Sequence, residues 1–175
     1  MESPLIGGVE KREIRIEDYD PRWQEIFAEH RARIGEALGD VAKSIEHVGS
    51  TSVPDLAAKP IVDVLVLVAD SGDEGSYLAP MEAAWYVLRV RESEFHEHRM
   101  FRTPQLDVHI HVFSRRCPEV DRMLAFRDRL RANAEDLRLY EETKRKLAAQ
   151  HWPDMNAYAA AKSDIVEQIL AGSRI

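Results

Sequence analysis

The sequence predicts an α/β (α+β) protein in which helices cover a β-sheet and the last third of the chain is helical. Residues 61 to 68, IVDVLVLV, are apolar except for Asp63, which is typical of a central strand buried on both faces. Residues 106 to 113 alternate apolar and polar side chains, as in a strand with one face on the core. From residue 119 onward, apolar side chains recur at helical spacing.

The chain length fits a single domain with a sizeable core. The protein has 175 residues, and we expect residues 13–175 to form one domain. Residues 1–12 include Pro4, Gly7 and Gly8 and are predicted to be a flexible lead.

The N-terminal part predicts a strand, a helix and a second strand. Residues 14 to 16 alternate as in a half-buried strand. Asp20 followed by Pro21 is a typical helix start, and this helix runs to about residue 38. Residues 43 to 48 then form a strand that leads into a polar turn.

The remaining chain predicts alternating helices and strands, and then helices alone. We expect a helix over 74–85, a strand over 86–91 and a hairpin of two strands, 94–102 and 106–113. Three helices follow over 119–132, 135–150 and 153–170, with Asn133 as a cap. The run Lys144-Arg145-Lys146 is expected on the solvated surface of this layer.

The polar turn before the central strand has the composition of an anion-binding loop. Gly49 allows close backbone approach, and Ser50, Thr51 and Ser52 supply hydroxyls, so we predict that this turn binds phosphate, with Lys59 as the nearest basic residue. The alternative is that Ser52 merely caps a short helix starting at Val53-Pro54.

Asp63 is the candidate centre of the chemistry. Burying a carboxylate costs on the order of several kcal/mol unless a cation, a metal ion or hydrogen-bond donors compensate its charge. A phosphate-binding turn followed by an acid on the next strand provides places for a phosphate and its divalent metal.

The stretch HVGSTSVPDLAAKPIVDVLVLV resembles the signature of the GrpB family, in the DNA polymerase beta-like nucleotidyltransferase superfamily. Further matching segments are Tyr19-Asp20-Pro21 with Trp23, His111-Val112-Phe113, Phe126-Arg127-Asp128 with Leu130-Arg131, and Tyr158 with Lys162-Ser163. The resemblance covers roughly residues 13 to 170 and implies a nucleotidyltransferase-like mixed sheet. It also implies that the turn binds a triphosphate and that three carboxylates hold two magnesium ions. The Tyr158 to Lys162 spacing implies that Lys162 points toward the phosphates.

The strand over 106–113 offers further candidate ligands. Asp107, His109 and His111 share one face, with the two imidazoles about 7 Å apart along the strand. This face, together with Asp63, is predicted to bind a divalent metal, either Mg, Mn or Zn; the alternative is a hydrated sheet face with ordinary hydrogen bonds. His96 and His98 on the preceding strand enlarge the histidine cluster, although each alone is typical of an exposed strand position.

One departure from the superfamily pattern weakens the case for catalysis. The paired acids of the superfamily lie two residues apart, whereas the neighbours of Asp63 at that spacing are Ile61 and Leu65. Asp63 and Asp107 remain the candidate catalytic carboxylates. The leading hypothesis is a protein that binds a nucleotide or a phosphorylated small molecule with a divalent metal and transfers a nucleotidyl group to a small acceptor. The alternatives are a catalytically degenerate nucleotide-binding or regulatory module, and a metal-dependent hydrolase.

Composition limits the partners. The net charge of −7 disfavours a polynucleotide and suits a small anion only where basic residues gather locally. A single cysteine, Cys117, fits a reducing cytosol. No apolar run approaches the roughly 20 residues of a membrane span, and the first residues lack the regions of a signal peptide, so we expect a cytoplasmic protein with no membrane partner. The oligomeric state is not predicted.

Overall fold

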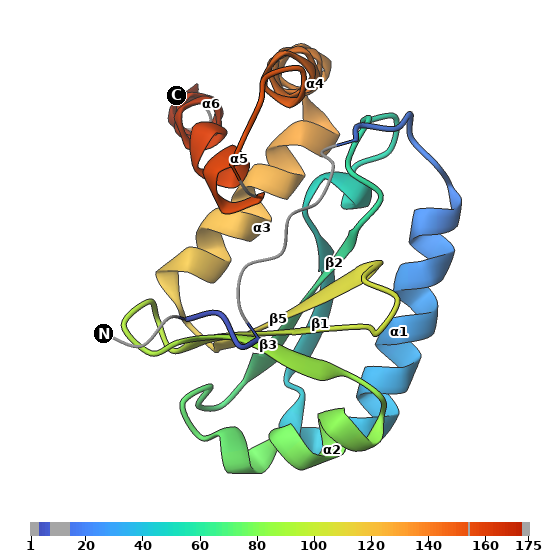
Figure 1. Cartoon of the computed structure of the whole chain (residues 1–175), viewed down its shortest axis with the longest axis vertical. Helices are drawn as coiled ribbons and strands as arrows, with labels where there is room; N and C mark the ends of the chain where they lie inside the picture. Colours follow the sequence, from blue (N-terminus) through green and yellow to red (C-terminus); the bar gives the residue numbers. More distant parts are fainter. Residues whose placement is uncertain (1–3, 8–14, 154, 173–175) are drawn as a thin grey trace.

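A five-stranded mixed sheet forms the centre of the computed structural model, which describes residues 4–7, 15–153 and 155–172 (Figure 1). The strand order is β1-β2-β5-β4-β3, and only β2 and β5 are parallel. The strands are β1 (Ser44–Val48), β2 (Val62–Val68), β3 (Val87–Glu92), β4 (His98–Arg102) and β5 (Val108–Ser114). The predicted α/β class with a mixed sheet and a helical C-terminal region is confirmed.

The two strands with the strongest sequence signals lie side by side in the middle of the sheet. Val62, Val64 and Val66 of β2 are buried on one face, opposite Val108, Ile110 and Val112 of β5. This pairing of apolar residues fixes the register, because a slip of one residue would move every side chain to the other face. Asp63 is therefore level with His109 on the opposite face.

Helices cover both faces of the sheet. The helix α1 (Arg22–Leu38), the short η1 turn (Gly39–Val41) and α2 (Leu78–Ala83) pack on the valine-rich face. The helices α3 (Pro118–Ala132), α4 (Ala134–Ala148), α5 (Met155–Ala161) and α6 (Ser163–Gly172) form a group on the other side (Figure 1). There, Val120 of α3 packs with Leu65 and Phe113, so this group covers the face that carries Asp63.

Several predicted elements differ from the observed ones. Ile14 lies outside the described residues, and Ile16 is in no strand; instead Glu17 pairs with Ala58 in an isolated bridge. The expected helix over 74–85 is a single turn, η3 (Glu74–Ser76), followed by α2. Pro80 explains this shortening, since it has no N–H to bond a preceding turn and is tolerated only near a helix start.

Two further differences affect the site. No helix starts at Val53-Pro54; the turn itself forms a short 3₁₀ segment, η2 (Ser50–Ser52), and the Ser52 hydroxyl donates to Gly49 O instead of capping a helix. The expected last helix is two helices, which meet at Lys162, whose N–H donates to Ala159 O in the tighter pattern of a helix end. The cap at Asn133 is confirmed, because its side chain accepts from Glu135 N and Asp136 N.

Part of the predicted flexible lead lies against the sheet. Ile6 N donates to Arg89 O at 2.8 Å, and Arg91 N donates to Pro4 O at 2.9 Å, so residues 4–7 follow the outer edge of β3. Residues 1–3 and 8–12 lie outside the described part, and there the lead stays a prediction. None of the described helices has the length and apolar character needed to cross a membrane.

Candidate functional site

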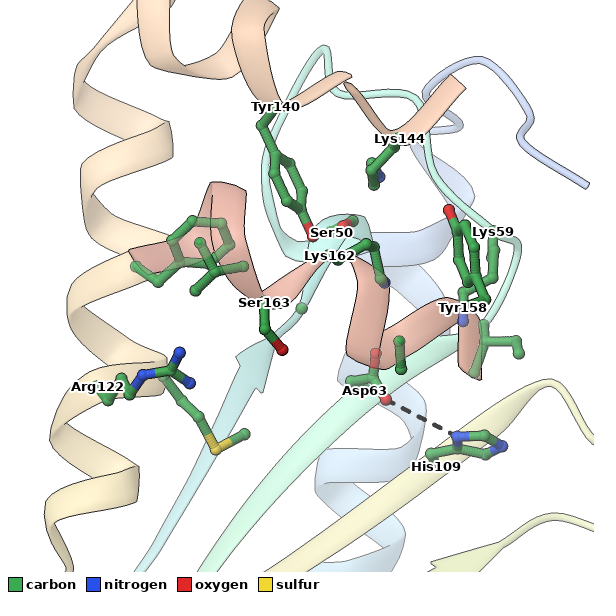
Figure 2. A pocket seen from close by; sticks show the side chains of 16 residues that line it. Ser50, Lys59, Asp63, His109, Arg122, Tyr140, Lys144, Tyr158, Lys162 and Ser163 are labelled. Atoms are coloured by element: carbon green, nitrogen blue, oxygen red, sulfur yellow. Dashed lines mark ion pairs between the residues drawn. The ribbon is translucent and has the colours of Figure 1, made fainter. Parts of the chain in front are cut away.

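A cavity of about 310 Å³ lies between the turn after β1, the sheet face that carries Asp63, and helices α3 to α6 (Figure 2). Asp63 and His109 come from the sheet, and Arg122 reaches the cavity from α3. The remaining charged side chains that line it are Lys59, Lys144 and Lys162. The cavity therefore brings together parts of the chain that are more than 100 residues apart, from the turn at Gly49 to α6.

Gly49 is required at its position because of Asp63. Its φ of +72° lies in the left-handed region, where residues other than glycine are strained. A Cβ on Gly49 would lie only 2.5 Å from Asp63 Oδ2. Gly49 thus allows the Asp63 carboxylate to lie close to the backbone, and the approach of a phosphate to this turn stays a prediction.

Asp63 is held by the histidines of β5. His111 Nε2 lies 3.0 Å from Asp63 Oδ1, and His109 Nδ1 lies 3.9 Å from the same oxygen. Burial raises the pKa of Asp63, but the hydrogen bond from His111 and the nearby cationic groups outweigh burial and lower the pKa to about 2. Asp63 is therefore ionised, and because a carboxylate only accepts hydrogen bonds, His111 Nε2 is the donor.

The structure brings two of the four residues of the predicted phosphate turn to the cavity. Gly49 and Ser50 line it, whereas Thr51 and Ser52 are buried and bonded elsewhere. Thr51 Oγ1 lies 3.0 Å from His47 Nε2, and Ser52 bonds back to the turn. These two hydroxyls thus stabilise the turn, and Ser50 is the hydroxyl placed to meet a ligand.

Asp107 is not brought to the cavity. Its Oδ1 accepts a hydrogen bond of 2.6 Å from Thr103 Oγ1, which closes the connection between β4 and β5. It lines a different surface hollow, together with Asp20 and Arg22 of the α1 start. The parity argument grouped Asp107 with His109 and His111, but its side chain bonds within the turn, and its hollow is lined by α1 residues and by Val62 of the opposite face.

The predicted set of four metal ligands is therefore incomplete at the cavity. Among the residues that the structure describes, no group of three or more His, Cys, Asp or Glu side chains is arranged to hold a metal ion. Of the predicted set, Asp63 and His109 line the cavity, and His111 bonds to Asp63 from the side. These residues do not fit the two-ion site that the superfamily implies, and the divalent metal stays an untested prediction.

Lys144 is placed differently from the prediction. The sequence run suggested a solvated surface, but Lys144 is only 1% exposed and its Nζ donates to Ala57 O at 2.7 Å. Its ammonium group lies 5.0 Å from the centre of the Tyr140 ring. Burial, together with the positive charges of Lys162 and Lys59, holds the pKa of Lys144 well below its usual value.

Lys59 and Lys162 lie near the same aromatic ring. The Nζ atoms of Lys59 and Lys162 are 5.3 and 4.8 Å from the centre of the Tyr158 ring. Both distances fit cation–π contacts, which hold the ammonium groups in place. Burial lowers the pKa of Lys162, and the charge of Asp63 partly offsets this effect. The implied role of Lys162 near a phosphate is consistent with this position.

Two tyrosine hydroxyls also belong to the cavity wall. Tyr140 shares a hydrogen bond with Ser50, and burial raises the pKa of Tyr140 to about 12. Tyr158 is fully buried, and its hydroxyl has no hydrogen-bond partner among the described residues. Because an unsatisfied buried hydroxyl costs about 1–3 kcal/mol, a partner in the cavity would stabilise this residue.

The charge of the cavity is opposite to that of the whole protein. Lys59, Lys144, Lys162 and Arg122 line it, and Arg122 also pairs with Glu119 and Glu167 at the rim. Asp63 is the one carboxylate among the lining residues of the described structure. A locally positive cavity in a protein of net charge −7 is suited to bind a small anion.

Comparisons with known sequences identify relatives over nearly the whole chain. The GrpB protein family matches residues 13–172. The UPF0157 protein SCO7215 of Streptomyces coelicolor is 55% identical over 163 residues, which are 93% of this chain and 85% of that protein. The UPF0157 protein BH1888 of Halalkalibacterium halodurans is 50% identical over 157 residues, which are 90% of this chain and 80% of that protein.

One solved structure shows the same relationship. The crystal structure of the conserved protein GrpB from Enterococcus faecalis aligns with a TM-score of 0.79 and 31% identity, covering 92% of this chain and all of that one. Cid1, described as an RNA terminal uridylyl transferase, shows a weak likeness, with a TM-score of 0.47 and 10% identity over 83% of this chain and 49% of its own. The family match over residues 13–172 and the relatives of 50 to 55% identity show that the chain belongs to the GrpB protein family.

Proposed function

We propose that the cavity binds a phosphorylated small molecule, either a nucleotide or a smaller phosphate ester. The observation that carries this proposal is the convergence of three lysines, Lys59, Lys144 and Lys162, on one buried space. Of the three, Lys144 is buried, where its charged form loses hydration, and its Nζ donates to a neutral carbonyl, Ala57 O. A phosphate dianion between the three side chains would add negative charge to that of Asp63.

Further features of the cavity support the same class of ligand. Ser50 and Ser163 provide hydroxyls, and Ser163 is the first residue of α6, where the helix dipole favours negative charge. Tyr158 provides a buried hydroxyl without a partner in the described structure. The volume of about 310 Å³ is at the lower end of small-molecule sites, which favours a small ester over a polymer.

A second candidate function is binding without transfer of a nucleotidyl group. Asp63 is the one carboxylate that lines the cavity in the described structure, and its Oδ1 already accepts a hydrogen bond from His111. Two-metal phosphoryl transfer needs carboxylates that share and flank two ions. This donor set favours a nucleotide-binding or regulatory role over fast transfer.

Thermal shift measurements test the proposed binding. We expect nucleotides or sugar phosphates to raise the melting temperature of the wild type, because a ligand that binds only the folded state stabilises it. Lys162→Met should lose this shift, whereas Lys146→Met, which changes an exposed lysine of α4, should keep it. Incubation with labelled nucleoside triphosphates and a range of acceptors then distinguishes transfer from binding alone. A protein whose melting temperature responds to none of these compounds would contradict the proposal.

A further inference from the structure

We infer that the cavity recognises phosphate without a divalent metal, because the lysines at Lys59, Lys144 and Lys162 supply the positive charge that metal ions provide in related folds. This inference rests on the proposed phosphate binding and specifies its chemistry. It starts from the disagreement between the two-ion site that the superfamily implies and the residues that surround Asp63.

The protein already engages one oxygen of the Asp63 carboxylate and packs closely against the other. Oδ1 accepts the hydrogen bond of 3.0 Å from His111 Nε2. Oδ2 lies against the Gly49 backbone, only 2.5 Å from the position that a Cβ would occupy there. His111 is also committed on its other side, since its Nδ1 lies 3.1 Å from His98 Nε2. A metal ion at Asp63 Oδ1 would have to displace the hydrogen bond from His111.

The cavity carries more positive than negative charge around Asp63. Lys144, Lys162 and Lys59 each line it, against one carboxylate in the described structure. A divalent cation entering this space meets repulsion from each lysine in its charged form, whereas a phosphate dianion is attracted by that form and favours it. The same residues therefore disfavour the metal and favour the anion.

Aromatic rings fix the positions of the ammonium groups before a ligand arrives. Lys59 and Lys162 lie near the Tyr158 ring at 5.3 and 4.8 Å, and Lys144 lies 5.0 Å from the Tyr140 ring. Lys144 is additionally held by Ala57 O. Charges held in place by the fold lose little freedom on binding, so they act as a preorganised site for anions.

Proton uptake gives an independent signature of this site. Burial lowers the pKa of both Lys144 and Lys162, and a bound phosphate would favour their charged forms. Binding of an anion should therefore draw protons from the buffer. Calorimetric titrations in two buffers with different ionisation enthalpies measure this uptake, and it should be smaller in Lys144→Met, which lacks one of the two amines, than in the wild type.

The decisive experiment is calorimetric titration with inorganic phosphate and with adenosine 5′-monophosphate, each in EDTA and in excess magnesium or manganese. We expect binding in EDTA with an affinity within about twofold of that with metal, since no ion takes part. Lys144→Met and Lys162→Met should each weaken binding about tenfold or more, as expected for loss of a charge-assisted contact. The control Lys146→Met should bind like the wild type.

Asp63→Asn separates the two mechanisms by the sign of its effect. In a metal-free site, this change removes the one negative charge beside the phosphate and should strengthen binding. In a metal site, it removes a ligand and should weaken binding. Binding that requires magnesium or manganese, or that falls in Asp63→Asn, would overturn this inference and leave the proposed function standing. Failure of every phosphate compound to bind in either condition would overturn both.

Discussion

His98 Nε2 and His111 Nδ1 lie 3.1 Å apart, and the two imidazole rings are nearly parallel, with an interplanar angle of 15°. The outer nitrogen of each ring contacts a carboxylate: His111 Nε2 contacts Asp63 at 3.0 Å, and His98 Nδ1 contacts Glu92 at 2.7 Å. A continuous chain of hydrogen bonds thus runs across β2, β5, β4 and β3, from the cavity to the edge of the sheet.

This chain predicts one shared imidazolium. Carboxylates only accept, so three contacts need three protons on two rings, which is one more than two neutral imidazoles carry. Burial and then the charge of His111 lower the pKa of His98 to about 4, so the pair does not carry two charges at neutral pH. Nitrogen-15 chemical shifts at neutral pH should show one imidazolium equivalent over His98 and His111.

Glu92→Gln is the matched control for this prediction. Its amide can donate to His98 Nδ1, which frees the His98 proton for His111, and the chain is then complete with two neutral rings. The imidazolium signal should disappear in this variant while the fold is kept. Two neutral rings in the wild type, with shifts equal to those of Glu92→Gln, would show that the chain is not complete in solution.

Gly49→Ala should reduce the free energy of unfolding for two separate reasons. The left-handed backbone costs about 1–2 kcal/mol for a residue with a Cβ, and the new methyl group would meet Asp63 Oδ2. Gly39→Ala provides the comparison, because Gly39 also has a positive φ, of +51°, but nothing lies within 4 Å of its Cβ position. Urea denaturation of both variants should show the larger loss at Gly49. Equal losses would mean that Asp63 moves aside freely.

Lys144→Met should raise the melting temperature of the ligand-free protein. Removing a buried ammonium group relieves its lost hydration, and we expect this gain to exceed the loss of the hydrogen bond to Ala57 O and of the contact with the Tyr140 ring. The pH dependence checks the cause. Because the folded-state pKa of Lys144 lies below its unfolded value of 10.5, the unfolded chain binds more protons, and wild-type stability rises with pH up to about that value. Lys144→Met should lack this rise, and a variant that melts lower and keeps the slope would refute the explanation.

His47 should make the protein sensitive to acid. Burial lowers the pKa of His47 to about 4, while Asp63 raises it and Arg131 and Arg127 lower it further. Above 6.5, both folded and unfolded forms are neutral; between 6.5 and about 4, only the unfolded chain takes up the proton, so stability falls as pH falls. The loss amounts to roughly 3 kcal/mol once pH reaches 4. Urea titrations from neutral pH down to about 4 should show a shallower decline in His47→Gln, and an equal decline in both proteins would contradict this assignment.

The sequence predicted the centre of the molecule better than its site. Continuous apolar runs and period-two alternation identified β2 and β5, and these signals are strong because burial dictates the residue type at each position. The parity argument correctly placed Asp63, His109 and His111 on one face. Sequence parity does not reveal side-chain bonds within a turn, which is why Asp107 was assigned to the cavity although it bonds to Thr103.

Lys144 was missed although a signal was present. Leu137, Tyr140 and Leu147 form an apolar stripe along α4, and Lys144 occupies the position of this stripe between Tyr140 and Leu147. A charged residue in an apolar stripe indicates a buried side chain with a functional role. The adjacent Arg145 and Lys146 suggested a solvated surface instead. His98 was likewise expected to be exposed, and it is buried through contacts between strands that the sequence does not specify.

The segment at residues 4–7 has a consequence for how copies of this protein behave at high concentration. β3 is an edge strand of the sheet, and the unpaired N–H and C=O groups of an uncovered edge strand can pair with a strand of another molecule. Ile6 and Pro4 already use Arg89 O and the Arg91 N–H, so the molecule occupies its own edge with its own backbone. The segment therefore covers the edge of β3 and blocks strand-to-strand pairing with another copy there. Proteolytic removal of the residues before residue 8 should leave a folded but less soluble protein.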